Sequence, residues 1–224
     1  MKNINLTKKN KICVICILVC ILLCSLGLFI SNQIQESRLK NPDKVMNEIL
    51  KIFYEDKYNS KMAKIILNKD ANKYFEDIEK DLYTRVYNSV KYMGDEKILE
   101  DKDVVTIAKE YSNKNIALLK QIDKYSIDSS IDSNNEKIYT IKVYPKDLSE
   151  MYAKKNECII HETKAYPEEN YKQIINYYCT TKSLNGTFED TKEPEILNIT
   201  LKKNKKGYYI PTEESLNSLL EIIS

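Results

Sequence analysis

A run of 19 residues without a charged side chain, residues 12–30, is the feature that most constrains this chain. At about 1.5 Å per residue, a helix of this length crosses the roughly 30 Å hydrocarbon layer of a bilayer. Four basic residues and no acidic residue precede the run: Lys2, Lys8, Lys9 and Lys11. We therefore expect a transmembrane anchor at residues 12–30, preceded by a basic tail at residues 1–11.

The same run has two alternative interpretations, a cleavable signal peptide and a lipoprotein signal. A cleavable signal peptide has an apolar core of roughly 7–15 residues that ends in small residues, and Ser25-Leu26-Gly27 resembles such an end. The apolar run continues past this site, which favours an uncleaved anchor. A lipoprotein signal needs a small residue before the modified Cys, whereas large apolar residues precede both Cys20 and Cys24.

The basic residues on either side of the run indicate its orientation. Lys and Arg near a membrane helix favour the cytoplasmic side. The four Lys and the free amine before the run outnumber Arg38, Lys40 and Lys44 soon after it. We expect a single-pass cell-membrane protein with a cytoplasmic N-terminus, a connector at residues 31–40 and an extracytoplasmic domain at residues 41–224.

Small residues form a stripe along the expected membrane helix. Cys16, Cys20, Cys24 and Gly27 fall on one side of a helix that turns about 100° per residue. Small residues four apart let two membrane helices approach closely, which predicts a homodimer or a partner helix. The alternative is that Cys serves here only as a small hydrophobe among Ile and Leu.

The composition of the remaining chain excludes two classes of function. Because four of the 35 basic residues precede the run, residues 31–224 carry 31 basic against 33 acidic residues. A nucleic-acid-binding domain is typically strongly basic. The whole chain has only four Gly, too few to indicate a phosphate-cradling loop. We therefore expect no nucleic-acid partner.

Apolar residues at helical spacing predict that the first half of the domain is helical. Asn41 and Pro42 supply a cap and a first-turn proline for the first helix. Further helices are predicted around residues 62–66, over residues 70–90 and over residues 104–121.

Alternating apolar and polar residues predict strands in the second half. Residues 125–129 and 139–143 form a predicted hairpin around the turn at residues 132–135. Residues 158–162 are a further predicted strand, and residues 197–201 show the cleanest alternation in the chain.

Capping and turn residues complete the expected order of elements. Helices are predicted after Pro145, Pro167 and Thr212, and the turn at residues 204–207 returns the last strand into Tyr208-Tyr209-Ile210. Helices first and antiparallel strands later indicate an α+β domain. The alternative is that residues 41–121 form a separate helical domain.

The C-terminal segment carries a resemblance to a known family. ILNITLKKNKKGYYIPTEESLNSLLEII, residues 196–223, holds a strand, a Lys- and Gly-containing turn, an aromatic-x-Ile strand and a closing helix. With the opening helix, this pattern resembles the NTF2-like or cystatin-like extracytoplasmic domains of Gram-positive (Firmicutes) membrane-anchored proteins and lipoproteins, although Tyr208 stands where such domains often carry Trp. The resemblance implies a curved antiparallel sheet that holds a helix over a concave face.

The expected role is binding or scaffolding at the cell envelope, without catalytic residues or a cofactor. The alternatives are a small-ligand or lipid carrier that uses a concave pocket, and an isomerase- or hydrolase-type enzyme in that pocket. The partner would be an envelope protein or polymer. Four lysines at the last turn are either a contact for an anionic polymer or lipid or a solvated face: Lys202, Lys203, Lys205 and Lys206.

Two Cys and the single His are the remaining candidates for chemistry. Cys158 and Cys179 are the only Cys outside the apolar run, and two thiols in an oxidising compartment tend to pair, which predicts a disulfide. The alternative is two reduced core thiols. His161 and Glu162 would be needed to complete a zinc site, but on the predicted strand Cys158 and His161 point to opposite faces, so we expect no metal.

Overall fold

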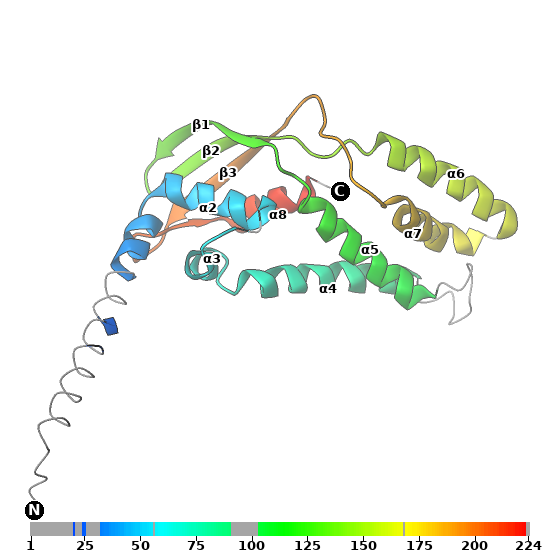
Figure 1. Ribbon diagram of the computed structural model, residues 1–224, viewed down its shortest axis with the longest axis horizontal. Coiled ribbons are helices and arrows are strands. Elements are labelled where there is room, and N and C mark those ends of the chain that lie inside the picture. The colour runs from blue at the N-terminus through cyan, green and yellow to red at the C-terminus, as the bar shows by residue number, and fades with distance from the viewer. Residues whose placement is uncertain are drawn as a thin grey trace, which may run out of the picture.

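The computed structural model shows an α+β fold with one four-stranded antiparallel sheet (Figure 1). It describes residues 20, 24–25, 32–55, 57–90, 103–167 and 169–222. The elements in chain order are α2 (Pro42–Tyr54), α3 (Ser60–Ile66), α4 (Ala71–Val90), α5 (Val104–Leu119), β1 (Tyr125–Ser133), β2 (Glu136–Val143), α6 (Ser149–Ala165), the 3₁₀ turn η2 (Glu169–Tyr171), α7 (Lys172–Ser183), β3 (Glu195–Lys203), β4 (Tyr209–Pro211) and α8 (Glu213–Glu221).

Capping side chains determine where two of the helices begin. Asn41 Oδ1 accepts the backbone N–H of Lys44 at 3.0 Å, and Pro42 occupies the first turn of α2. Thr212 Oγ1 accepts the backbone N–H of Ser215 at 3.2 Å at the start of α8. The predicted starts of both helices are confirmed.

The sheet has the order β1-β2-β3-β4, and its inner face is filled with side chains. Burial alternates along the second half of β2, as expected for a strand with one buried face. Five side chains of this face are at most 1% exposed: Tyr139, Ile141, Val143, Ile199 and Leu201. Together with Ile49 and Phe53 of α2 they form one core, so α2 covers the inner face of the sheet (Figure 1).

The chain between β2 and β3 forms a helix pair that extends the molecule away from the sheet (Figure 1). α6 packs on α7, and α7 packs on α4 and α5. A second apolar cluster joins these helices: Val90, Ile107, Ile174, Ile175 and Cys179. Helices from the first half of the chain therefore share cores with the sheet and with the later helices.

Residues 158–162 are helical, so the predicted strand there is wrong. They lie inside α6, a helix of 17 residues. A short apolar run fits either a buried strand or part of a helix, and its own periodicity does not separate the two. Ala153, Lys154 and Lys155, a few residues before the run, favour helix. The helix therefore continues through the run.

The segment expected as a connector, residues 31–40, is helical over residues 32–39. Leu39, at the end of this helix, is fully buried in the core beneath the sheet. The backbone N–H of Lys40 donates to the carbonyl oxygen of Glu36 at 3.1 Å. The chain thus enters the domain through a helix whose last turn is packed into the core.

The predicted anchor lies outside the described residues, apart from Cys20, Cys24 and Ser25. Within the described ranges, no helix has both the length and the apolarity to cross a bilayer. Cys20 and Cys24 are exposed free thiols. Cys16 and Gly27, the other members of the predicted packing face, lie outside the described residues.

Candidate functional site: a lysine groove at the end of the sheet

A groove of about 940 Å³ lies between α3 and the β3–β4 hairpin. Five lysines line it and define what we call the lysine groove: Lys64, Lys202, Lys203, Lys205 and Lys206. Tyr208 and Ile210 supply apolar surface, and among the residues that the structure describes no Asp or Glu lines the groove. Such a surface attracts anions.

The turn that carries two of these lysines is held by local hydrogen bonds. Asn204 Oδ1 accepts the backbone N–H groups of Lys206 at 2.9 Å and Tyr208 at 3.1 Å. Gly207 has φ +76°, a conformation that a residue with a Cβ rarely adopts. Its N–H donates to the carbonyl oxygen of Asn204 at 2.9 Å. Lys205 is therefore presented to solvent from an ordered backbone.

The lysines differ in how far their charge is already compensated. Lys202 Nζ pairs with Glu136 Oε1 at 2.8 Å, and Lys203 Nζ lies 5.2 Å from the centre of the Tyr209 ring. Among the described residues, no carboxylate forms an ion pair with Lys205 or Lys206. The tip of the turn thus carries the charge that is most available to a ligand.

The lysine groove lies at the end of the sheet where the chain enters the domain. Glu136, which pairs with Lys202, precedes Lys137, and Lys137 Nζ lies 3.0 Å from Asp43 Oδ1 in the first turn of α2. The backbone N–H of Lys203 also donates to the carbonyl oxygen of Asn135 in the β1–β2 turn at 2.8 Å. Both hairpin turns and the start of α2 therefore share one end of the molecule.

Asp43 links the two elements at this end. Its Oδ1 accepts the hydroxyl of Tyr139 at 2.5 Å, in addition to the contact with Lys137. Hydrogen bonds from Tyr139 and then from Lys137 hold the pKa of the Asp43 carboxyl below its usual value. Burial and the same hydrogen bond raise the pKa of Tyr139. Asp43 is therefore ionised at neutral pH and connects α2 to β2.

A second, smaller hollow of about 250 Å³ is lined mainly by residues of α2, with Met62 of α3. Arg38, Lys44 and Lys51 line it together with Glu48 and Met62. Arg38 belongs to the helix at residues 32–39. Basic side chains thus also lie beside the segment that leads to residues 12–30.

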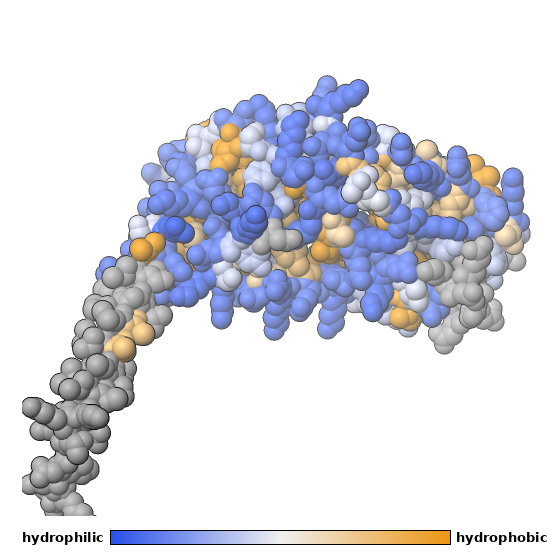
Figure 2. Space-filling view, viewed as in Figure 1, coloured by the Kyte–Doolittle hydropathy of each residue, from blue (hydrophilic) through white to orange (hydrophobic). Residues whose placement is uncertain are grey.

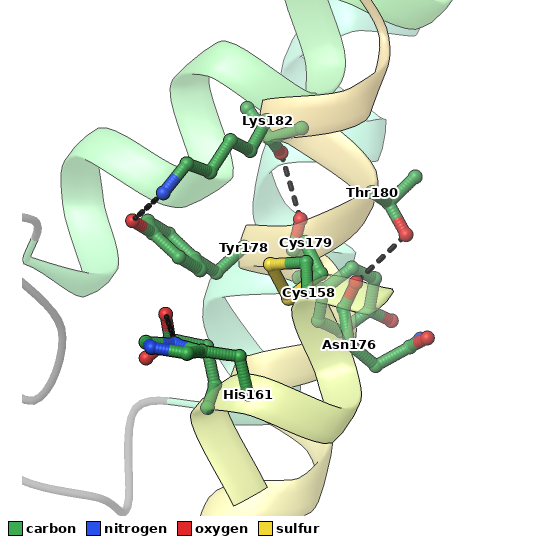
Figure 3. Close-up of a disulfide and its surroundings, with 10 residues drawn as sticks. Cys158, His161, Asn176, Tyr178, Cys179, Thr180 and Lys182 are labelled. Atoms are coloured by element: carbon green, nitrogen blue, oxygen red, sulfur yellow. Dashed lines mark hydrogen bonds and ion pairs between the residues drawn. A yellow bond between two sulfur atoms is a disulfide. The ribbon is translucent and has the colours of Figure 1, made fainter. Parts of the chain in front are cut away.

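The predicted disulfide is confirmed between α6 and α7 (Figure 3). The Cα atoms of Cys158 and Cys179 are 5.6 Å apart, and Cys179 is fully buried. On the same helix as Cys179, Lys182 Nζ donates to the hydroxyl of Tyr178 at 3.2 Å. The bond joins α6 and α7 where these helices meet the second apolar cluster.

His161 lies in α6 and not in the predicted strand, which changes the argument about metal binding. Residues three apart on a helix share a face, so Cys158 and His161 do not point to opposite sides. The Cys158 sulfur is bonded to Cys179, however, and His161 is 76% exposed with its Nδ1 3.2 Å from Glu162 Oε1. Among the described residues, no three His, Cys, Asp or Glu are placed to hold a metal ion.

Lys64 is the one of the five groove lysines that the sequence did not indicate. It lies on α3, more than a hundred residues before the other four lysines, and the contact between α3 and β4 brings them together. No local pattern around Lys64 signals this neighbour. The four lysines of the hairpin, in contrast, were visible as a run of basic residues at a predicted turn.

No protein-family model and no curated protein matches the chain. A crystal structure of the Bacillus subtilis protein YcdA, described as a candidate lipoprotein, is similar over 83% of this chain with 15% sequence identity and a TM-score of 0.46. The chain spans 56% of the length of that protein.

Proposed function

We propose that the chain is a membrane-anchored protein whose extracytoplasmic domain binds or scaffolds anionic partners at the cell envelope, without catalysis. The lysine groove is the observation that carries this proposal, because it is an open surface whose described lining holds five lysines and no carboxylate. Figure 2 shows that the visible face of the domain is mostly hydrophilic, with scattered apolar residues. A domain of this kind suits an aqueous surface next to a membrane.

Two features support an extracytoplasmic location. The apolar run at residues 12–30 is long enough to span a bilayer, with the basic residues placed before it. The Cys158–Cys179 disulfide suits an oxidising compartment, because cytosolic thiols are normally kept reduced.

The filled sheet favours binding at the surface over a pocket function. A carrier or an enzyme of the NTF2-like kind would use the concave face of the sheet. This face is filled instead, because Tyr139 and Ile141 of β2 are buried in one core with Phe53 of α2. The arrangement of α2 over an antiparallel sheet supports the resemblance to NTF2-like or cystatin-like domains as a proposal for the fold. It supports a surface role more than a ligand cavity.

The small-ligand carrier remains a second candidate through a different hollow. A space of about 480 Å³ lies among α4, α5 and α8, and apolar Ile78, Leu82, Ile116 and Leu220 contribute to its lining. Asp81, Arg85 and Glu221 line the same space. An apolar probe that binds there, and is lost in an Ile116→Trp variant, would favour the carrier.

Anchoring and topology are tested together on cells that express the full chain. We expect the protein to stay in the membrane pellet during alkaline carbonate extraction, and we expect protease added to intact cells to digest the domain. A Leu22→Arg/Leu23→Arg variant should leave the pellet, because two charges at the centre of a span cost about 5 kcal/mol or more. The matched Leu22→Ala/Leu23→Ala variant should be retained.

Two results would contradict the proposal. Extraction of the unmodified chain by carbonate would exclude an integral anchor. Digestion of the domain only after the membrane is opened would place it on the cytoplasmic side.

A further inference from the structure

We infer that the lysine groove binds the phosphate-bearing headgroups of anionic lipids in the same membrane that holds the chain. The inference rests on the proposed anchoring at residues 12–30 and names the ligand of the groove. Its consequence is that the end of the sheet lies against the bilayer surface, so the α6–α7 helix pair points away from it.

The chain path places the groove close to the membrane. Leu39 is buried in the core, and only residues 31–38 separate it from the end of the apolar run. As a helix, eight residues span about 12 Å, and even fully extended they span less than about 30 Å. The buried Leu39 thus limits how far the domain can move from the surface.

The contacts of the β-hairpins place the groove on the side of the domain that faces this short connection. Asp43, four residues after Leu39, contacts Lys137, and the neighbouring Glu136 contacts Lys202 of the groove. Figure 1 shows the start of β2 and the end of β3 beside the helix that leads into α2. The groove and the connection to the membrane are therefore at the same end of the molecule.

The chemistry of the groove suits a layer of phosphate groups. Lys205 and Lys206 are exposed at the tip of an ordered turn, and no carboxylate of the described part of the chain lines the groove to compete for them. Clusters of Lys and Arg next to a membrane segment attract anionic lipids. Tyr208 in the same groove adds an amphipathic ring of the kind that favours the headgroup region.

Proximity favours lipid over a soluble anionic polymer as the ligand. A site tethered near a surface meets the groups on that surface at a high effective concentration. Arg38 and Lys44, at the end of the connection and the start of α2, add further basic charge near the membrane segment. A polymer would have no such advantage from the tether.

The test uses the full chain reconstituted into nanodiscs of phosphatidylcholine, with or without about one third phosphatidylglycerol. Lysines are acetylated briefly with an amine reagent, and the modification of each is measured by mass spectrometry. We expect phosphatidylglycerol to slow modification of Lys205 and Lys206 by at least roughly fivefold, the effect expected for one lysine held at an anionic surface. Lys154 and Lys164, exposed on the distant α6, are the internal controls and should not change.

Variants link the protection to the groove. In a Lys205→Gln/Lys206→Gln protein, phosphatidylglycerol should no longer slow the acetylation of Lys64 and Lys203 to the same extent, so most of their protection from acetylation should be lost. A Lys154→Gln/Lys164→Gln protein removes the same charge from α6 and should behave like the unmodified chain. Salt at about 0.5 M should remove the protection in the unmodified chain and in the Lys154→Gln/Lys164→Gln protein, because an exposed site is screened.

The outcomes separate the anchor from the ligand of the lysine groove. Retention of the chain on pure phosphatidylcholine after a carbonate wash reports the anchor alone. Retention with equal modification in both lipids would overturn the headgroup inference and leave the anchoring intact. Protection by soluble polyphosphate but not by phosphatidylglycerol would also overturn it, and would make a soluble polymer the ligand. A chain that is not retained on phosphatidylcholine but is protected on phosphatidylglycerol would refute the anchor and keep the groove.

Discussion

Breaking the Cys158–Cys179 bond should destabilise the α6–α7 helix pair more than any other part of the domain. The bond closes a segment of 22 residues, since the two Cys are 21 positions apart. In the chain-entropy account, such a loop contributes about 3 kcal/mol to the free energy of unfolding. For a protein of this size, 3 kcal/mol corresponds to a melting temperature lower by roughly 6–12 °C.

The assay compares the oxidised and the reduced protein, because reduction leaves both sulfur atoms in place. Thermal unfolding is followed by circular dichroism on the full chain in detergent, and hydrogen exchange reports which helices lose protection. We expect faster exchange in α6 and α7, with β2 and β3 little changed, because the sheet has its own core. Reductant should have no effect on a Cys158→Ala/Cys179→Ala variant, which serves as the control.

Equal melting temperatures of the oxidised and reduced proteins, within about 1 °C, would refute this reasoning. Such a result would mean that packing of α7 on α5 alone holds the helix pair in place. A loss of protection that begins in the sheet would be equally contrary, because the disulfide lies in the second apolar cluster and not in the core beneath the sheet.

Four further predictions concern the end of the sheet and the anchor. Asp43→Ala should lower the free energy of unfolding by about 1 kcal/mol in denaturant titration, because the hydroxyl of the buried Tyr139 loses its acceptor. The control Asp81→Ala removes an exposed helical ion pair and should lower the free energy of unfolding by less than about 0.5 kcal/mol. Because the pKa of Asp43 is lowered from 3.8 in the folded protein, its contribution is complete above that pH and is lost as pH falls through the lowered pKa, so acid titration should reduce the difference between the unmodified chain and Asp43→Ala. Gly207→Ala should cost about 1 kcal/mol in the same denaturant assay, because φ is +76° while a Cβ there meets no atom within 4 Å. Gly27→Leu should reduce disulfide-independent dimerisation in detergent, measured by crosslinking, if the predicted packing face joins two membrane helices.

Most of the secondary structure could be predicted because local chemistry determined it. Asn41 and Thr212 cap the helices that they were expected to cap. The alternation along residues 197–201 corresponds to β3, and the turn at 204–207 is held by Asn204 and Gly207. Such signals involve residues a few positions apart, so a sequence contains all that is needed to recognise them.

Features that depend on distant neighbours could not be predicted in the same way. Residues 158–162 were assigned to a strand because their apolar run is compatible with both structures; in the fold they continue α6, which packs on α7. Leu39 looked like part of a polar connector, yet the core beneath the sheet buries it. Lys64 joins the groove only through the contact of α3 with β4. Each of these required the fold before its role was visible.

The most direct test of the central claim is thiol labelling of Cys158 and Cys179 on intact cells, in a variant with Cys13, Cys16, Cys20 and Cys24 replaced by Ala. A membrane-impermeant maleimide is applied with and without an impermeant reductant. The account predicts that labelling occurs from outside and only after reduction, first at the partly exposed Cys158 and more slowly at the buried Cys179 as α6 and α7 open. Labelling that needs the membrane to be opened and proceeds without reductant would contradict it, because the domain would then be cytoplasmic and its thiols unpaired.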